Sequence, residues 1–218
     1  VLLTVTGACA IHCRYCFRQH FDYQANLPTS TAQEAIVSYL YEHTEINEVI
    51  LSGGDPLSLS NRRLFIWLDL LEAVPQLTPI RLHTRLPVVI PERLDEELLA
   101  RLASSRCQIV MVIHCNHPNE IDETTAQHLQ RARAADITLL NQAVLLRDIN
   151  DNLQTQVALS KRLFAVGVLP YYLHLLDKVA GGAHFDNSER SAIELYWALL
   201  AQLPGYLVPK LVCELPNK

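Results

Sequence analysis

Short apolar segments typical of β-strands alternate six times with longer segments whose apolar residues recur about every 3.6 positions. The strand candidates are residues 2–6, 48–52, 80–84, 108–114, 138–144 and 169–175. The helix candidates are residues 31–43, 61–73, 91–104, 122–135, 152–165 and 187–203. Six βα units in series predict parallel strands joined by right-handed crossovers.

The length of the chain favours one of the two folds that such units build. A complete eight-unit barrel typically needs about 250 residues, and this chain has 218. We therefore predict an α/β fold, a partial (β/α)6 TIM-like barrel, with an open doubly wound sheet as the alternative. Residues 1–218 contain no linker or charge block and are expected to form one domain. The start inside an apolar stretch without Met favours a fragment of a longer chain lacking N-terminal and C-terminal segments.

Composition narrows the function classes. The net charge is −5 and the 18 Lys and Arg are scattered, so a nucleic-acid partner is not expected. No apolar run reaches the roughly 18–20 residues of a membrane span, and no signal peptide is apparent, which predicts a cytoplasmic protein. Cys107 and Cys115 lie in an apolar run and are predicted to be small core residues.

Polar residues concentrate directly after the predicted strands. They occupy residues 9–16, 53–55, 83–85, 114–117, 141–142 and 174–177, in the order of the strands. In parallel α/β folds the carboxyl ends of the strands form the functional site. Six separate segments are therefore predicted to contribute to one site.

Cys9, Cys13 and Cys16 form a CxxxCxxC motif. Thiolates are the usual ligands of iron–sulfur clusters, and three of them leave one iron of a [4Fe–4S] cluster open for a small molecule. A zinc site would need a fourth ligand; His12 lies within the motif, but no second pair of ligands follows at matching spacing. Three unligated cysteines on a turn are the remaining alternative.

A CxxxCxxC motif directly after a first strand, with Tyr15 beside the last cysteine and Phe17 after it, resembles the radical SAM superfamily. The resemblance implies a partial barrel of the radical SAM type and a [4Fe–4S] cluster whose open iron binds S-adenosylmethionine (SAM). One electron then cleaves SAM into methionine and a 5′-deoxyadenosyl radical, while the protein supplies position and excludes water. Gly53, Gly54 and Asp55, which alone read equally well as a simple turn, look like the motif that receives the amino group of SAM.

Longer stretches resemble a narrower family, the lysine 2,3-aminomutases. They are CRYCFR at 13–18, SGGDPL at 52–57, LHTRLPVVIP at 82–91, HCNHPNE at 114–120, NQAVLLRDIND at 141–151 and YYLHLLD at 171–177. The details CRYCFRQHF and VPKLV look closer to the branch that makes (R)-β-lysine for modification of elongation factor P (EF-P). The resemblance implies an isomerase that moves the α-amino group of L-lysine to the β carbon. It also implies pyridoxal 5′-phosphate (PLP) as a cofactor and an electron donor such as flavodoxin or ferredoxin, and it leaves a homo-oligomer open.

The resemblance also implies residue roles. Arg18 would bind the substrate carboxylate as a bidentate fork, and Asp177 would pair with the ε-ammonium of lysine. In isolation either residue reads as an ordinary surface charge. PLP needs a lysine, for which Lys218 is the catalytic candidate, because Lys210 lies too early. Glu214 is the nearest match for an acid that helps hold the ε-ammonium.

Other strand-end residues are second-rank candidates for contacts with SAM or PLP: His83, His114, Asn116, Asn141, Gln142 and His174. Arg85 reads equally well as a phosphate ligand or as one half of a structural ion pair.

Three rival functions remain open. A glutamate 2,3-aminomutase would have little reason to keep an acid such as Asp177 for a distal ammonium. Another radical SAM enzyme without PLP would fit if Lys218 forms no imine. A non-catalytic iron–sulfur or zinc-binding scaffold would need neither the GGDP segment nor Arg18 and Asp177 at the same mouth.

Overall fold

The computed structural model of the chain describes residues 1–23 and 30–214. Seven strands form one sheet: β1 (Leu2–Thr6), β2 (Val49–Gly53), β3 (Pro79–Thr84), β4 (Gln108–His114), β5 (Thr138–Val144), β6 (Leu169–His174) and β7 (Lys210–Val212). The α-helices are α2 (Ser30–Glu42), α3 (Asn61–Glu72), α4 (Leu86–Val89), α5 (Glu96–Ala103), α6 (Glu123–Ala134), α7 (Leu153–Ala165) and α8 (Glu189–Gln202). Short 3-10 turns are η1 (Pro56–Ser58), η2 (Pro91–Arg93), η3 (Pro118–Glu120), η4 (Ala183–Phe185) and η5 (Gly205–Leu207).

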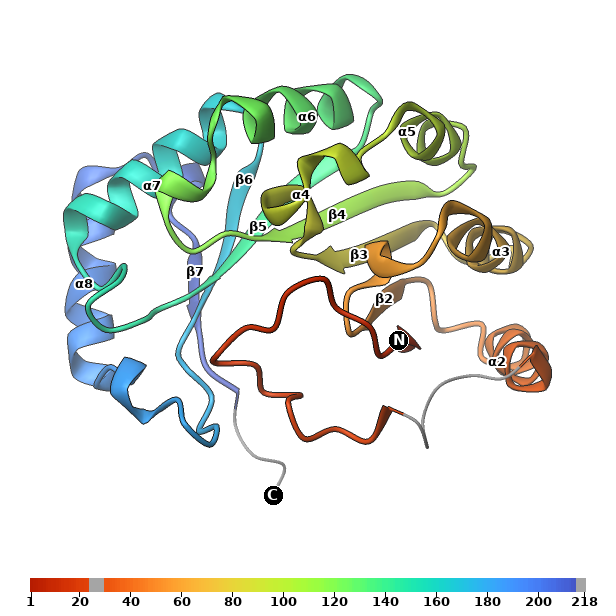
Figure 1. Cartoon of the computed structure of the whole chain (residues 1–218), viewed down its shortest axis with the longest axis horizontal. Coiled ribbons are helices and arrows are strands. Elements are labelled where there is room, and N and C mark those ends of the chain that lie inside the picture. The colour runs from red at the N-terminus through yellow and green to blue at the C-terminus, as the bar shows by residue number, and fades with distance from the viewer. Residues whose placement is uncertain (24–29, 215–218) are drawn as a thin grey trace.

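The strand order decides between the two predicted folds. Each strand pairs in parallel with the next one along the chain, from β1 to β7. A doubly wound sheet would instead reverse its order at a switch point. Figure 1 shows the sheet bent into an arc, with α2, α3, α5, α6, α7 and α8 along its convex side. The partial barrel is confirmed, and the open doubly wound sheet is not observed.

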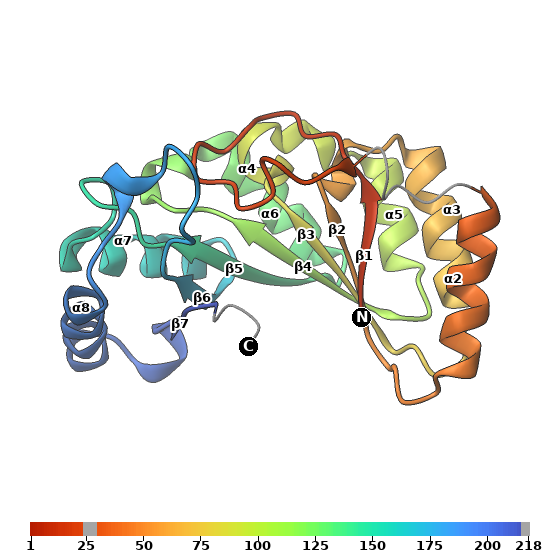
Figure 2. The ribbon, with the colours of Figure 1, turned by 90° about the horizontal axis from the view of Figure 1, so that it is seen from below.

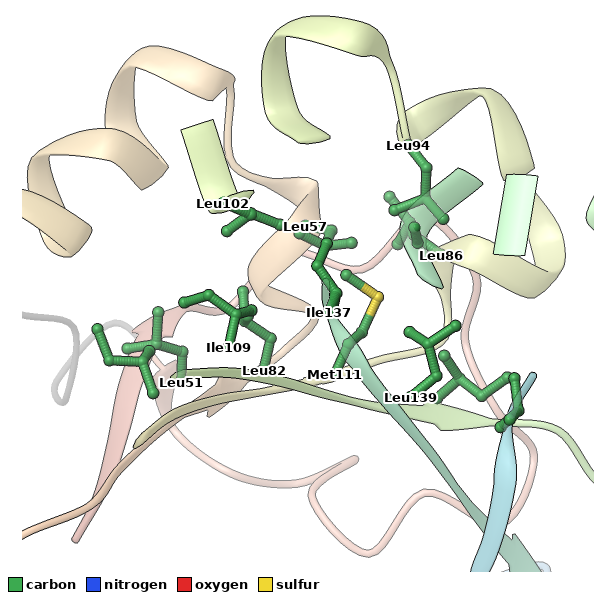
Figure 3. Packing of buried hydrophobic residues seen from close by; sticks show 14 of the residues in the cluster. Leu51, Leu57, Leu82, Leu86, Leu94, Leu102, Ile109, Met111, Ile137 and Leu139 are labelled. Carbon is green, nitrogen blue, oxygen red and sulfur yellow. The ribbon is translucent and has the colours of Figure 1, made fainter. Parts of the chain in front are cut away.

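The hydrophobic core lies between the convex face of the sheet and the helices. Leu51, Leu82 and Met111, from three successive strands, are completely buried there, and Figure 3 shows them pointing to the same side as Leu139 of β5. Burial of one such side chain stabilises the fold by about 1.5–3 kcal/mol. Because strand side chains alternate between faces, the residues between these positions point to the concave side of the sheet.

The six predicted strands are all present, with bounds that shift by at most one residue at an end. β7 was not predicted; it has three residues and pairs with β6, where Leu211 lies beside Leu173. The helix predicted over residues 91–104 is interrupted, because Asp95 accepts a 2.7 Å hydrogen bond from the Leu98 amide and caps α5 as a new helix. Cys107 and Cys115 are buried, as predicted.

Within residues 1–23 and 30–214, no helix has the length and apolar character needed to cross a bilayer. The longest of the described helices, α8, has 14 residues.

Candidate active site

The three clustered cysteines lie on one loop, residues 7–23, which we call the cysteine loop. It leaves the carboxyl end of β1 and crosses the concave side of the arc (Figure 1). Figure 2 shows the loop at the end of the barrel to which the β1 arrow points. The segment before α8 contacts it, since Gln19 donates a 3.0 Å hydrogen bond to the Ala180 carbonyl and Arg14 lies 5.2 Å from the centre of the Phe185 ring. Loop and segment together partly cover the mouth of the barrel.

The thiols of the cysteine loop influence one another electrostatically. The pKa of Cys9 is raised to about 11, first by burial, then by Asp55, Cys16 and Cys13. A bound cationic iron centre would remove this penalty, so the donor set fits an iron–sulfur cluster. In the described part of the chain no three His, Cys, Asp or Glu side chains are arranged around a single metal ion.

Gly54 joins the end of β2 to the start of the cysteine loop. Its amide donates a 2.7 Å hydrogen bond to the Thr6 carbonyl, and the next amide, of Asp55, donates a 2.8 Å hydrogen bond to the Ala8 carbonyl. A Cβ atom on Gly54 would lie 2.3 Å from that Ala8 oxygen. The backbone of the cysteine loop therefore approaches Gly54 so closely that no side chain fits there.

We expect Gly54→Ala to displace the cysteine loop, because a methyl group at 2.3 Å from a backbone oxygen forces the loop to move. The cost is about 1–3 kcal/mol of folding stability, as for other overpacked sites. Urea denaturation measures that cost, and iron and sulfide analysis after reconstitution measures the loss of cluster. Gly205→Ala is the matched control, because a Cβ there meets no atom within 4 Å. Equal cluster content in both variants would contradict this role of Gly54.

Asp55 is 5% exposed and is fully engaged by the protein. Its carboxylate accepts hydrogen bonds from Thr84 Oγ1 (2.6 Å) and from the amides of Leu57 (3.0 Å), Arg85 (2.7 Å) and Leu86 (3.2 Å). Burial raises the pKa of Asp55, and these bonds oppose the rise. The carboxylate therefore organises the turns after β2 and β3, and its predicted contact with the amino group of SAM stays a prediction.

Three histidines line the concave face. His83 of β3, His114 of β4 and His174 of β6 all occupy positions between the residues buried under the helices. His114 Nε2 lies 2.8 Å from Nε2 of Gln142 on the next strand, and the His83 and His114 rings are 6.1 Å apart. The buried Nε2 atoms of His83 and His174 have no hydrogen-bond partner among the described residues. Such atoms are costly unless paired, so this face fits a bound polar cofactor such as SAM or PLP.

His83 and His114 are neutral at pH 7. The pKa of His114 is lowered to about 3 and that of His83 to about 4, in each case first by burial. Nearby cations lower both further; Arg18 acts on both rings, Arg85 on His114, and Arg81 on His83. A face with this balance of charge attracts the carboxylate or phosphate groups of ligands.

The depressed pKa of His83 predicts acid sensitivity. In the unfolded chain the imidazole titrates near 6.5 and in the folded chain near 4, so the unfolded state binds the proton more readily. Stability is then complete above pH 6.5 and falls as the pH drops toward 4. When the pH falls from 7.5 to 4.5, we expect the free energy of unfolding of the His83→Gln variant to decrease by about 1–2 kcal/mol less than that of the native chain, allowing for solvent screening. Urea denaturation at the two pH values measures this difference. His20→Gln, at an exposed position, should lose as much as the native chain; equal losses in all three would refute the prediction.

The structure fixes Arg18 beside the end of β2. Its Nη1 donates hydrogen bonds to Ser52 Oγ (2.9 Å) and to the Gly53 carbonyl (3.1 Å), and its guanidinium lies 4.8 Å from the centre of the Phe17 ring. The guanidinium is therefore held at the mouth of the barrel, where its role as a carboxylate ligand was predicted.

Asp177, after β6, and Glu214, after β7, form an acidic pair at the opposite edge of the sheet from β1. Burial raises the pKa of Asp177, and Glu214 raises it further. Both acids also act on His174, whose pKa they raise against the larger effect of burial. Neighbouring carboxylates that repel each other favour a cation between them. Lys218, the predicted PLP lysine, lies outside the described residues.

A largely buried network of hydrogen bonds follows β3 and β4, and no sequence pattern predicted it. Arg85 forms a 2.6 Å ion pair with Glu120 and also donates to the Tyr15 hydroxyl. Of the two readings of Arg85, the ion pair is the one observed. Asn116 also binds Tyr15, and its Oδ1 accepts a 2.9 Å hydrogen bond from the Val144 amide. The predicted contact of Asn116 with SAM stays a prediction, and so do those of His114 and Gln142.

Asn141 hydrogen-bonds to the backbone at the end of β4, and its predicted contact with SAM stays a prediction. Its side chain accepts a hydrogen bond from the Cys115 amide (2.9 Å) and donates one to the Cys115 carbonyl (3.1 Å). Both bonds lie within the buried layer under the helices, because Asn141 is 2% exposed.

A partial parallel barrel whose first strand leads into a loop with three cysteines defines a radical SAM fold and site. Residues 3–152 match the radical SAM superfamily, and the chain belongs to that superfamily. A [4Fe–4S] cluster and SAM are the cofactors of this class of enzyme.

The chain is 48% identical over 221 residues to L-lysine 2,3-aminomutase from Haemophilus influenzae, an alignment that covers 100% of this chain and 65% of that protein. It is 49% identical to L-lysine 2,3-aminomutase from Escherichia coli, over 98% of this chain and 63% of that protein. The chain thus spans less than two thirds of these relatives. A radical SAM methyltransferase from Sphaerobacter thermophilus shares the fold, with a TM-score of 0.66 and 16% identity over 98% of this chain and 65% of that one.

Proposed function

We propose that this chain is the core domain of a radical SAM, PLP-dependent lysine 2,3-aminomutase that converts L-lysine to (R)-β-lysine. One observation supports it most directly: Arg18 lies beside the end of β2, and the acids Asp177 and Glu214 adjoin beyond β6 and β7. A cation and an acidic pair at one mouth suit a substrate with a carboxylate at one end and an ammonium at the other. The similarity to proteins named L-lysine 2,3-aminomutase covers the whole chain.

In this proposal Cys9, Cys13 and Cys16 hold three irons of the cluster, and the open iron and SAM supply the radical chemistry when bound. The protein residues position the substrate. Arg18 binds its carboxylate, and Asp177 with Glu214 binds the ε-ammonium. Together these contacts fix both ends of lysine and present the α and β carbons between them.

The concave face has a separate role. His83 and His114 are neutral at pH 7, so they offer hydrogen bonds to bound cofactors without adding charge. The cysteine loop and the segment before α8 restrict water at the mouth, which protects reactive species. Lys218 would hold PLP, the cofactor that supplies the path for migration of the amino group.

The proposal extends to the cellular setting. We place the chain in the cytoplasm, as one domain of a longer protein, with flavodoxin or ferredoxin as its electron donor. The CRYCFRQHF and VPKLV segments support a role in supplying β-lysine for the modification of EF-P.

The direct test is anaerobic reconstitution with iron and sulfide, followed by SAM, a reductant, PLP and either L-lysine or L-glutamate. We expect 5′-deoxyadenosine together with β-lysine, and no β-glutamate. Preference for glutamate would instead indicate a glutamate 2,3-aminomutase. Turnover of SAM that does not depend on PLP would indicate another radical SAM enzyme, and a cluster that never cleaves SAM would indicate a scaffold.

A further inference from the structure

Arg85 connects three parts of the chain that are far apart in sequence. It follows β3, and its Nη1 donates a hydrogen bond to the Tyr15 hydroxyl and lies 3.7 Å from Cys13 Sγ. Its Nη2 lies 2.6 Å from Glu120 Oε2, after β4. The side chain of Arg85 is only 16% exposed. The guanidinium is therefore held against the cysteine loop in a position from which water is mostly excluded.

Glu120 fixes the far side of Arg85. While Oε2 receives the guanidinium, Oε1 accepts hydrogen bonds from the amides of Asn116 (2.7 Å) and His117 (2.8 Å). The Asn116 side chain in turn donates to the Tyr15 hydroxyl. Tyr15 thus receives two donors that are both anchored at the ends of β3 and β4. The middle of the cysteine loop is tied to the sheet through these bonds.

The charge at this position has an electrostatic consequence. A guanidinium stays protonated under all relevant conditions. A cluster gains one negative charge when it takes up an electron, and a cation beside one of its thiolates stabilises that form more than the oxidised one. Because the surroundings screen weakly, the effect is larger than at an exposed site. Hydrogen bonds to cluster sulfurs and local charge are recognised determinants of cluster potential.

We propose that Arg85 is a positioning residue that holds the cysteine loop through Tyr15 and makes a cluster bound at Cys13 easier to reduce, with Glu120 moderating its charge. This inference rests on the proposed cluster ligation. It assigns the two charges opposite effects: Arg85 raises the reduction potential, and Glu120 lowers it.

The test is a spectroscopic redox titration of the reconstituted chain, in which dithionite supplies the electron and the reduced cluster is followed by electron paramagnetic resonance. We expect Arg85→Met to shift the midpoint potential to more negative values and Glu120→Gln to shift it to more positive values. Arg85→Lys keeps the charge and should stay nearer to the native value than Arg85→Met. Arg101→Met is the matched control, because Arg101 of α5 is also a largely buried arginine held in ion pairs, here with Asp69 and Glu72 of α3.

Opposite shifts in the two variants, with native potential in the Arg101 variant, support the inference, since a merely structural role does not predict a sign. Unchanged or equal shifts overturn it while leaving the cluster assignment intact. If Arg85→Met fails to hold a cluster, the Glu120→Gln shift decides alone: a positive shift supports the inference and its absence overturns it. A native chain that assembles no cluster overturns the ligation and this inference together.

Discussion

Replacement of Cys13 by serine is expected to abolish the iron–sulfur cluster and, with it, the cleavage of SAM. The cysteine loop offers three thiols, and a [4Fe–4S] cluster with one open iron needs all of them. A serine oxygen is a much poorer ligand for iron in this setting. The expected result is loss of the visible absorbance of the cluster, iron and sulfide contents near zero, and 5′-deoxyadenosine formation at background.

Cys213→Ser is the control for this experiment, because Cys213 is a free and exposed thiol on the C-terminal side of β7. That variant should keep native iron content and native SAM cleavage. A Cys13 variant that retains the full cluster would disprove the ligand assignment. Similar losses in both variants would point instead to general thiol damage during reconstitution.

Replacement of Asp177 by asparagine is expected to raise KM for L-lysine about 10- to 100-fold, which corresponds to the loss of one hydrogen bond between charged groups, about 1.5–3 kcal/mol. The change keeps the size of the side chain and removes the charge that pairs with the ε-ammonium. Glu214 remains, so binding is weakened rather than abolished. Initial rates over a range of lysine concentrations separate KM from kcat.

Asp136→Asn is the matched control. Asp136 is exposed and precedes β5, at the opposite end of the barrel from the mouth, and its φ of 60° is one that asparagine tolerates. Native KM in this variant and a raised KM in the Asp177 variant would support the substrate role. Unchanged KM for lysine in the Asp177 variant would refute it.

The local patterns of the sequence predicted much of the fold. Strand and helix periodicities arise within single elements, and this is why the six predicted strands appear in the structure within one residue of their expected bounds. β7 was not predicted, because a strand of three residues is too short to show a periodic pattern of apolar residues. α5 begins later than expected because the cap at Asp95 competes with continuation of the turn before it.

The candidate site likewise contains residues with a local sequence signal and contacts without one. The three cysteines occur within eight residues, and their spacing alone indicated a metal cluster. The roles of Arg18 and Asp177 were implied by the resemblance to the lysine 2,3-aminomutases and remain predictions, supported by the way parallel strands bring their carboxyl ends to one mouth. The pairing of Arg85 with Glu120, 35 residues apart, has no local signal. The same holds for the hydrogen bond between Thr84 and Asp55, which are 29 residues apart.

By itself, the sequence determined the order of the six longer strands and their helices, the cluster of three thiols and the end of the sheet where polar residues gather, because these depend on spacing along the chain. Only the tertiary structure decided which polar groups are already paired and which face the concave interior with no partner among the described residues. His83 and His174 belong to the second group and Asp55 to the first. The reason is physical: burial and hydrogen bonding depend on neighbours from other strands, and those neighbours are fixed only when the sheet closes into its arc.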